Sequence, residues 1–275
     1  MKTGAFSIVL SAHYLMETSS INMHPKPLIA FDFDGVLCDS ANETCTAAWK
    51  TAYQHFWPDL NRQVPDLVRQ GFSVVRPALE TGYEAVLIVK LLSEGYPAES
   101  LRQSLPYYLQ RLSQQYQLDN TVLKQTFGQV RDDWISHHPE QWLQMNPLYP
   151  GVSNVLSQYH QDDYVIITTK QERFVHQILA ANNIHPTTQQ VFGLDRQCSK
   201  LEILQQLRQQ HAQRPIHFIE DRLATLLPIQ HNDALTPLTV SLATWGYNTP
   251  QDKTIAKQRH IPLLTLADLS CLMAN

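Results

Sequence analysis

The chain has 275 residues, enough for one large domain or two modest ones with an ample apolar core. It carries 21 Lys and Arg against 25 Asp and Glu, with no basic block, which argues against a nucleic-acid partner. No apolar run is long enough to span a membrane, and four scattered cysteines without C-x-x-C spacing favour reduced thiols in a cytoplasmic protein.

Residues 1–26 are expected to form an N-terminal extension without ordered structure. Lys2 and the apolar stretch over 5–10 share features with a signal peptide. His13 and Tyr14 interrupt that pattern, however, and no small-x-small cleavage site follows. We interpret the segment as a disordered extension, or as the product of a start codon assigned too early.

An apolar run over 28–31 ends at two aspartates, Asp32 and Asp34. Pro27 and Gly35 bound this stretch, which predicts a buried parallel strand. Parallel α/β sheets bind ligands beyond the carboxyl ends of their strands. Two carboxylates at that place repel each other unless a metal ion or a proton relieves the repulsion. The pair therefore indicates chemistry, because packing alone gives no reason for it.

Residues 41–147 lack the alternation of strands and helices that an α/β sheet requires. Their apolar residues recur at helical spacing over 67–79 and 86–92, and further helices are predicted over 100–118 and 121–137. We interpret this stretch as an all-helical module that is inserted after the first strand.

From residue 148 onward, predicted strands and helices alternate. The strands are expected at 164–167, 191–193, 216–219 and 238–242. The helices are expected at 151–160, 171–182, 199–211 and 222–230. This alternation predicts a parallel sheet covered by helices on both faces. Residues 27–40 and 148–275 are thus predicted to form a Rossmann-like α/β core, and residues 41–147 an inserted helical cap.

Polar residues follow the predicted strands at one edge of this sheet. They are Asp32 and Asp34, then Thr168, then Lys200 in a loop, and finally Glu220 and Asp221. The ordered series resembles the motifs of the haloacid dehalogenase-like superfamily, most of whose members are phosphatases, many with a helical cap after the first strand. Asp32-Phe33-Asp34-Gly35-Val36 is similar to the first motif, Thr168 to the second, Lys200 to the third and Glu220-Asp221 to the fourth. Tyr149-Pro150-Gly151-Val152 and Trp245-Gly246-Tyr247 are similar to the phosphoglycolate-phosphatase-like branch, and the resemblance covers roughly residues 27–270.

The resemblance implies Mg²⁺-dependent hydrolysis of a small-molecule phosphate ester, and the composition predicts no nucleic-acid or membrane partner. Asp32 and Asp221 would bind the metal ion, together with the backbone carbonyl of Asp34. Glu220 would be either a further metal ligand or an orienting partner. The commoner fourth motif has Gly before its Asp and a further Asp one turn later. Here Glu220 and Thr225 occupy those positions, which puts the metal affinity in question.

The same resemblance implies a role for each catalytic residue. Asp32 would attack phosphorus and form an aspartyl-phosphate, and Asp34 would act as general acid and then as general base. That role requires a raised pKa for Asp34. Thr168 would donate a hydrogen bond to the phosphoryl group, with Thr169 as its rival. Lys200, with Lys170 as its rival, would supply a positive charge.

In the predicted cap, the segment 76–84 combines charged residues with Pro77 and Gly82. Arg76 and Glu80 are predicted to face the substrate, although a polar corner on the surface has the same pattern. Two other functions remain open: a phosphomutase that uses the same aspartates, and a non-catalytic binding protein with this fold. The sequence does not give the oligomeric state.

Overall fold

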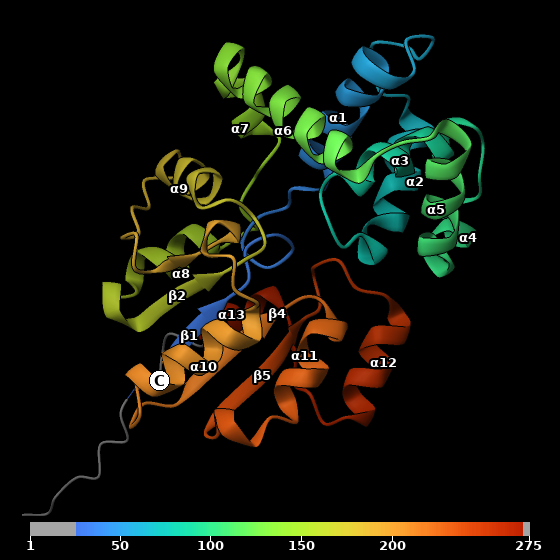
Figure 1. Cartoon of the computed structure of the whole chain (residues 1–275). Coiled ribbons are helices and arrows are strands. Elements are labelled where there is room, and N and C mark those ends of the chain that lie inside the picture. The colour runs from blue at the N-terminus through green and yellow to red at the C-terminus, as the bar shows by residue number, and fades with distance from the viewer. Residues whose placement is uncertain (1–25, 272–275) are drawn as a thin grey trace, which may run out of the picture.

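The first strand lies in the middle of a six-stranded sheet in which every neighbouring pair is parallel (Figure 1). This computed structural model describes residues 26–271, and the strand order is β3-β2-β1-β4-β5-β6. The strands are β1 (Leu28–Phe31), β2 (Tyr164–Ile167), β3 (Val191–Phe192), β4 (Ile216–Glu220), β5 (Leu238–Ala243) and β6 (Leu263–Leu264). The predicted parallel α/β sheet is confirmed. Strand β6 was not predicted from the sequence.

Helices cover both faces of the sheet. They are α8 (Val152–Gln158), α9 (Glu172–Ala180), α10 (Lys200–Gln210), α11 (Leu223–Gln230), α12 (Pro250–Gln258) and α13 (Leu266–Cys271). Side chains of β1 alternate between the faces: Ile29 and Phe31 pack in the apolar cluster shared with α8 and α9, and Leu28 and Ala30 in the one shared with α10 and α11. This two-sided burial explains why β1 is a continuous apolar run.

Over residues 41–147, between β1 and α8, the described chain forms helices and no strand. The helices are α1 (Ala41–Thr51), α2 (Asp66–Val75), α3 (Glu84–Ser93), α4 (Ala98–Gln103), α5 (Leu105–Tyr116), α6 (Asn120–His137) and α7 (Pro139–Gln144). We call residues 41–147 the helical insert. The helical stretch expected over 100–118 is helical in the structure, but it is divided into two helices at Ser104. Pro106 lacks the backbone N–H that would continue the hydrogen bonds of α4.

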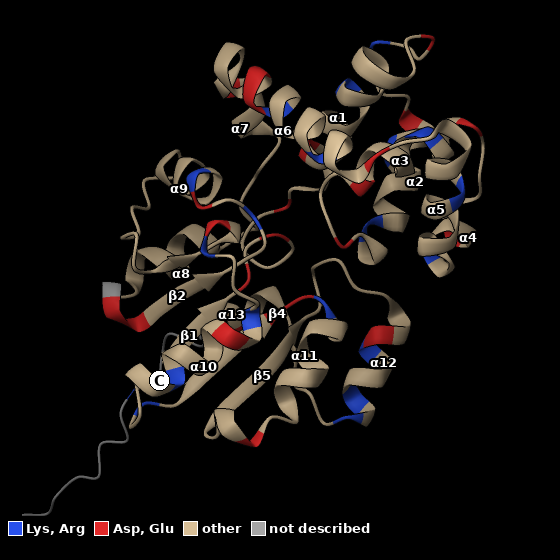
Figure 2. Ribbon diagram, in the orientation of Figure 1, with Lys and Arg blue, Asp and Glu red and all other residues tan. Residues whose placement is uncertain are grey.

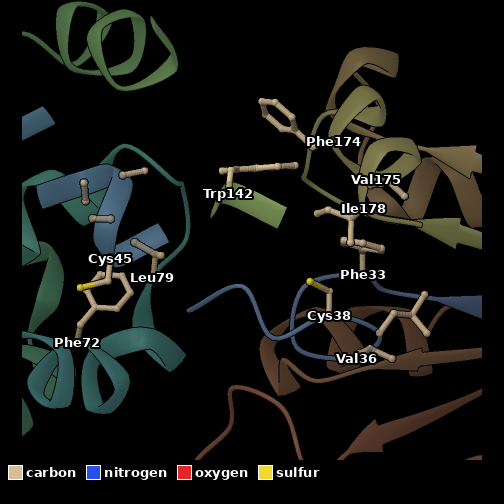
Figure 3. Packing of buried hydrophobic residues seen from close by; sticks show 14 of the residues in the cluster. Phe33, Val36, Cys38, Cys45, Phe72, Leu79, Trp142, Phe174, Val175 and Ile178 are labelled. Atoms are coloured by element: carbon tan, nitrogen blue, oxygen red, sulfur yellow. The ribbon is translucent and has the colours of Figure 1, made fainter. Parts of the chain in front are cut away.

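Two short connections join the insert to the sheet, and they pair with each other. Asp39 N–H donates to Pro147 O at 2.9 Å, and Tyr149 N–H donates to Leu37 O at 3.0 Å. Trp142 of the insert packs on Phe174 of α9 with ring centroids 5.5 Å apart (Figure 3). One apolar cluster therefore runs from the sheet into the insert.

The extension expected over 1–26 lies outside the described residues, apart from Lys26, whose Nζ lies 3.1 Å from Asp163 Oδ2. Among the cysteines with described side chains, Cys38, Cys45 and Cys198 form no disulfide. A search of the described helices finds none with the length and apolar character needed to cross a membrane.

Candidate active site

Three buried carboxylates meet at the carboxyl ends of β1 and β4. Asp32 directly follows β1, Glu220 is the last residue of β4 and Asp221 follows it. One oxygen from each of the three lies within 4.8 Å of the others. The strands are adjacent and parallel, and Asp32 N–H donates to Ile219 O at 2.9 Å. The backbone therefore determines this acidic cluster, which the sequence predicted as one group at one sheet edge.

Lys200, the first residue of α10, is the cation that contacts this cluster. Its Nζ lies 2.7 Å from Asp32 Oδ1 and 2.6 Å from Glu220 Oε2. Burial, and then the charge of Glu220, raise the pKa of Asp32 to about 7 even though Lys200 opposes the shift. Burial and Glu220 likewise raise the pKa of Asp221 well above its usual value. Three carboxylates beside one lysine leave negative charge uncompensated.

This donor set fits a hard divalent cation. Mg²⁺ prefers oxygen ligands and is commonly bound through one or two carboxylates. A bound cation would favour the charged forms of Asp32 and Asp221, which burial disfavours. Glu220 is turned toward Lys200 and also accepts from Arg222 N–H at 3.1 Å, an arrangement that suits an orienting partner.

Two loops pack tightly around Asp221. Tyr247 N–H donates to Asp221 Oδ2 at 2.6 Å. Gly35 has a φ of +90°, and a Cβ added there would lie 2.0 Å from Asp221 Oδ2. A Cβ at Gly246 would lie 2.4 Å from Asp221 Cβ. Glycines in the two sequence motifs thus allow the backbone to approach the carboxylate closely.

We expect Gly35→Ala to displace Asp221 and to weaken Mg²⁺ binding about tenfold, because the added methyl group overlaps the carboxylate. Gly95→Ala is the matched control: Gly95 has a φ of +84°, but a Cβ there meets nothing within 4 Å. Both variants should lose about 1–3 kcal/mol of stability from backbone strain. Calorimetric titration with Mg²⁺ checks the difference, and equal affinities in the two variants would contradict this role of Gly35.

Asp34 has a different environment from the one that its predicted role requires. Its Oδ1 lies 2.9 Å from Lys170 Nζ, and its carboxylate is not part of the cluster of three. Although burial raises it, the pKa of Asp34 is lowered, because Lys170 and then Arg76 favour the charged form. The raised pKa expected from the sequence is therefore absent in this state of the protein. Metal binding through the Asp34 backbone carbonyl stays a prediction.

A cleft of about 570 Å³ lies between the insert and the core, and Asp32, Asp34 and Asp221 open into it. Its lining is more basic than acidic, with seven Lys and Arg against four Asp and Glu. Figure 2 shows charged residues in the loops between the insert and the strand ends, as well as on helices elsewhere. Such a cleft favours an anionic ligand.

The two candidate threonines occupy different places. Thr168 is buried directly after β2, and its Oγ1 accepts from Lys170 N–H at 3.1 Å. Thr169, its rival, lines the cleft. The role predicted for Thr168 stays a prediction, and Thr169 is the better exposed of the two.

Arg76 and Glu80 of the insert both line the cleft. The Arg76 guanidinium lies over the Tyr247 ring, 4.0 Å from its centroid, so this part of the insert contacts the loop that holds Asp221. Sequence reasoning assigned no contact to Tyr247 and treated Lys170 as a rival of Lys200. The structure gives each lysine its own aspartate.

Known proteins are similar to this chain in sequence or in fold. No model of a known protein family matches the chain. A phosphoglycolate phosphatase of Aliivibrio fischeri is 28% identical over 170 residues, which cover 61% of this chain and 61% of that protein. A predicted phosphoglycolate phosphatase of Haemophilus somnus has a TM-score of 0.56 at 17% identity, covering 91% of this chain and 99% of the other. A haloacid dehalogenase-like family hydrolase of Streptococcus pneumoniae has a TM-score of 0.52 at 18% identity, covering 90% and 96%.

Proposed function

We propose that this chain, which belongs by its fold to the haloacid dehalogenase-like superfamily, is a Mg²⁺-dependent phosphatase acting on a small phosphorylated metabolite. The observation that carries the proposal is the buried carboxylate cluster of Asp32, Glu220 and Asp221 beside a cleft with a basic lining. The relative from A. fischeri, named as a phosphatase, supports the same activity.

Asp32 and Asp221 would hold the metal ion, with Glu220 orienting Lys200 beside them. When bound, Mg²⁺ supplies positive charge that screens the repulsion between an anionic nucleophile and an anionic phosphate ester. Lys200, which contacts Asp32, would contribute positive charge in the same sense.

Asp32 is the proposed nucleophile. Its Oδ1 is held by Lys200, and Oδ2 accepts no hydrogen bond from the described residues. A carboxylate oxygen attacks phosphorus and forms an aspartyl-phosphate, while the bond from phosphorus to the ester oxygen breaks. The leaving oxygen takes a proton from Asp34. Water then gives a proton back to Asp34 and attacks phosphorus, which releases phosphate and restores Asp32.

Asp34 needs a proton for the first of these steps, and its contact with Lys170 opposes protonation. A phosphoryl group entering the cleft brings negative charge next to both side chains. That charge competes for Lys170 and raises the pKa of Asp34, which favours the protonated acid. Lys170 thereby acquires a role separate from that of Lys200.

The helical insert would act as the cap over this site. Arg76 and Glu80 face the cleft from the insert, and closure there would exclude water during transfer and select the leaving group. A cytoplasmic location remains a prediction from the cysteine pattern.

The proposal is tested by phosphate release from an aryl phosphate and from a panel of metabolite phosphates that includes phosphoglycolate. We expect turnover that depends on Mg²⁺, falls to background with EDTA and returns with excess Mg²⁺, because the acidic cluster needs the cation. Mg²⁺ at about a hundred times its Kd should also stabilise the fold by about 2.7 kcal/mol.

Asp221→Asn is expected to remove most of that Mg²⁺-dependent stabilisation, measured by thermal unfolding with and without the ion. Asp268→Asn, at an exposed helix end remote from the cleft, is the matched control. No turnover by a folded, metal-loaded protein would overturn the phosphatase proposal and favour a non-catalytic binding protein. An isomerised sugar phosphate in place of free phosphate would instead indicate a phosphomutase.

A further inference from the structure

Tyr247, in the loop after β5, holds Asp221 through its backbone and reaches the insert through its side chain. Its N–H donates to Asp221 Oδ2 at 2.6 Å. The same loop packs directly on the loop after β1, since a Cβ added at Gly246 would lie 2.2 Å from Gly35 O. The backbone of Tyr247 is therefore closely fixed relative to the acidic cluster.

The Tyr247 hydroxyl contacts the start of the insert. It donates to Asp39 Oδ1 at 2.8 Å and accepts from the N–H of Ala41, the first residue of α1, at 3.0 Å. The first N–H groups of a helix have no partner within the helix, and the side chain of the residue before it commonly caps them. Ser40 precedes α1 and makes no such bond. The cap comes instead from Tyr247, 206 residues away, together with Asp39 Oδ1 at 3.3 Å.

Two further contacts connect Tyr247 to the insert. Asp39 lies in the first connection between the sheet and the insert, and its N–H donates to Pro147 O of the second connection at 2.9 Å. The hydroxyl of Tyr247 therefore acts where the two connections pair. The ring of Tyr247 lies under the Arg76 guanidinium, 4.0 Å from it. One side chain thus contacts the insert both at the start of α1 and at Arg76.

Other side chains also bridge the insert and the core, but without a hydrogen bond to the acidic cluster. Trp142 packs on Phe174, and Asp132 pairs with Arg173. Among the described residues, neither Phe174 nor Arg173 donates to a carboxylate of the cluster. Tyr247 differs from these bridges because one residue bonds both to a proposed metal ligand and to the insert.

Packing alone does not require the Tyr247 hydroxyl. A phenylalanine ring would fill nearly the same volume and still support Arg76, whereas only the hydroxyl bonds to Asp39 and Ala41. A cation bound at the cluster would hold the Asp221 carboxylate in place. Hydrogen bonds to a charged acceptor are roughly twice as strong as neutral ones, so a fixed carboxylate also fixes the Tyr247 backbone. The aromatic side chain carries that order to the start of α1.

We infer that Tyr247 is a positioning residue that couples the metal site to the insert. It holds α1 and Arg76 in place relative to the cleft when Asp221 has bound Mg²⁺. The inference rests on the proposed function, because it takes the acidic cluster as the Mg²⁺ site. It adds that metal loading of the core orders the insert before a substrate enters. Such coupling is a free energy shared between two sites, and it is measurable at either one.

Hydrogen exchange of the backbone amides, measured on the full chain with and without Mg²⁺, tests the coupling. We expect Mg²⁺ to slow the exchange of residues 41–44 about tenfold. Tyr247→Phe should reduce this protection to less than twofold, because the first turn of α1 loses its bond to the loop. Calorimetric titration should give a Kd for Mg²⁺ within about twofold of the parent, because the N–H that holds Asp221 is retained.

Thr244→Val is the matched control. Thr244 lies in the same loop, and its hydroxyl donates to Leu264 O at 2.7 Å within the core. This variant also loses one hydroxyl contact, but it should keep the protection of residues 41–44. In the parent and in Tyr247→Phe, Mg²⁺ should protect residues 76–79 as well, because the ring still supports Arg76. Tyr247→Leu should lose both protections.

The inference is overturned if Mg²⁺ protects residues 41–44 equally in the parent and in Tyr247→Phe, or fails to protect them in a parent that binds the ion. If Tyr247→Phe does not fold, Asp39→Ala removes the other partner of the hydroxyl contact. Unaltered protection in that variant would contradict the coupling in the same way. These readouts need no turnover, so absence of phosphate release by the Mg²⁺-loaded protein contradicts the phosphatase proposal alone.

Discussion

Asp32→Asn is expected to lower kcat for an aryl phosphate by at least about a thousandfold, as removal of a nucleophile does in other covalent mechanisms. An amide oxygen is a poor nucleophile and would form no aspartyl-phosphate. Phosphate release at saturating substrate and Mg²⁺ measures the effect.

The matched control for this prediction is Asp163→Asn, since Asp163 forms ion pairs with Lys26 and Arg214 away from the cleft. Its kcat should stay within about twofold of the parent. If the Asp32 variant retained a tenth of the parental kcat, a nucleophilic role for Asp32 would be wrong.

Unfolding measurements on the Asp32 variant give a second, independent readout. The pKa of Asp32 is raised to about 7 in the folded chain, above the value of 3.8 for an unperturbed aspartate. Without divalent cation, the ionised group therefore reduces stability as the pH rises from about 4, and the cost is complete above about 7. The variant should lack this loss, so its stability relative to the parent should increase with pH.

The fold could be predicted from the sequence where a local pattern determined each element. The continuous apolar run of β1 and the later alternation of strands and helices gave a parallel sheet, and the structure has it. The break between α4 and α5 at Ser104 depends on a single residue, Pro106. The helical spacing of the apolar residues around it predicted an uninterrupted helix. Strand β6 forms because its two leucines pair with the free edge of β5. Its formation therefore depends on the sheet and not on the local sequence.

The candidate site was predictable to the same extent. Residues at the carboxyl ends of strands come together because parallel strands end at one edge, and Asp32, Glu220 and Asp221 do so. Contacts that join distant segments had no such signal. Arg131 and Glu43 are 88 residues apart, and Lys170 and Asp34 are 136 apart. No local spacing encodes these pairs, since tertiary packing of the insert and the sheet creates them.

Lys200→Met is expected to reduce both stability and activity. It leaves Asp32 and Glu220 buried without the cation that now lies within 2.7 Å of both, and loss of one partner from a buried pair costs about 3–5 kcal/mol. It also removes a charge beside the phosphoryl group, for which we expect a loss of about 100- to 1,000-fold in kcat. Denaturant unfolding and phosphate release measure the two effects separately.

The pH dependence distinguishes this electrostatic effect from a packing defect. Lys200 has a pKa raised above its usual value, so its charge is present in both folded and unfolded chains from pH 5 to 9. Removing it eliminates a contact that lowers the pKa of Asp32, which then rises further above about 7. The loss of stability should therefore be largest above pH 7 and smaller near pH 5, where protonation neutralises Asp32.

The matched control is Lys26→Met, at an exposed ion pair, which should lower the free energy of unfolding by less than about 1 kcal/mol at either pH. A Lys200 variant destabilised equally at both pH values would show that the lysine stem, and not its charge, stabilises this site.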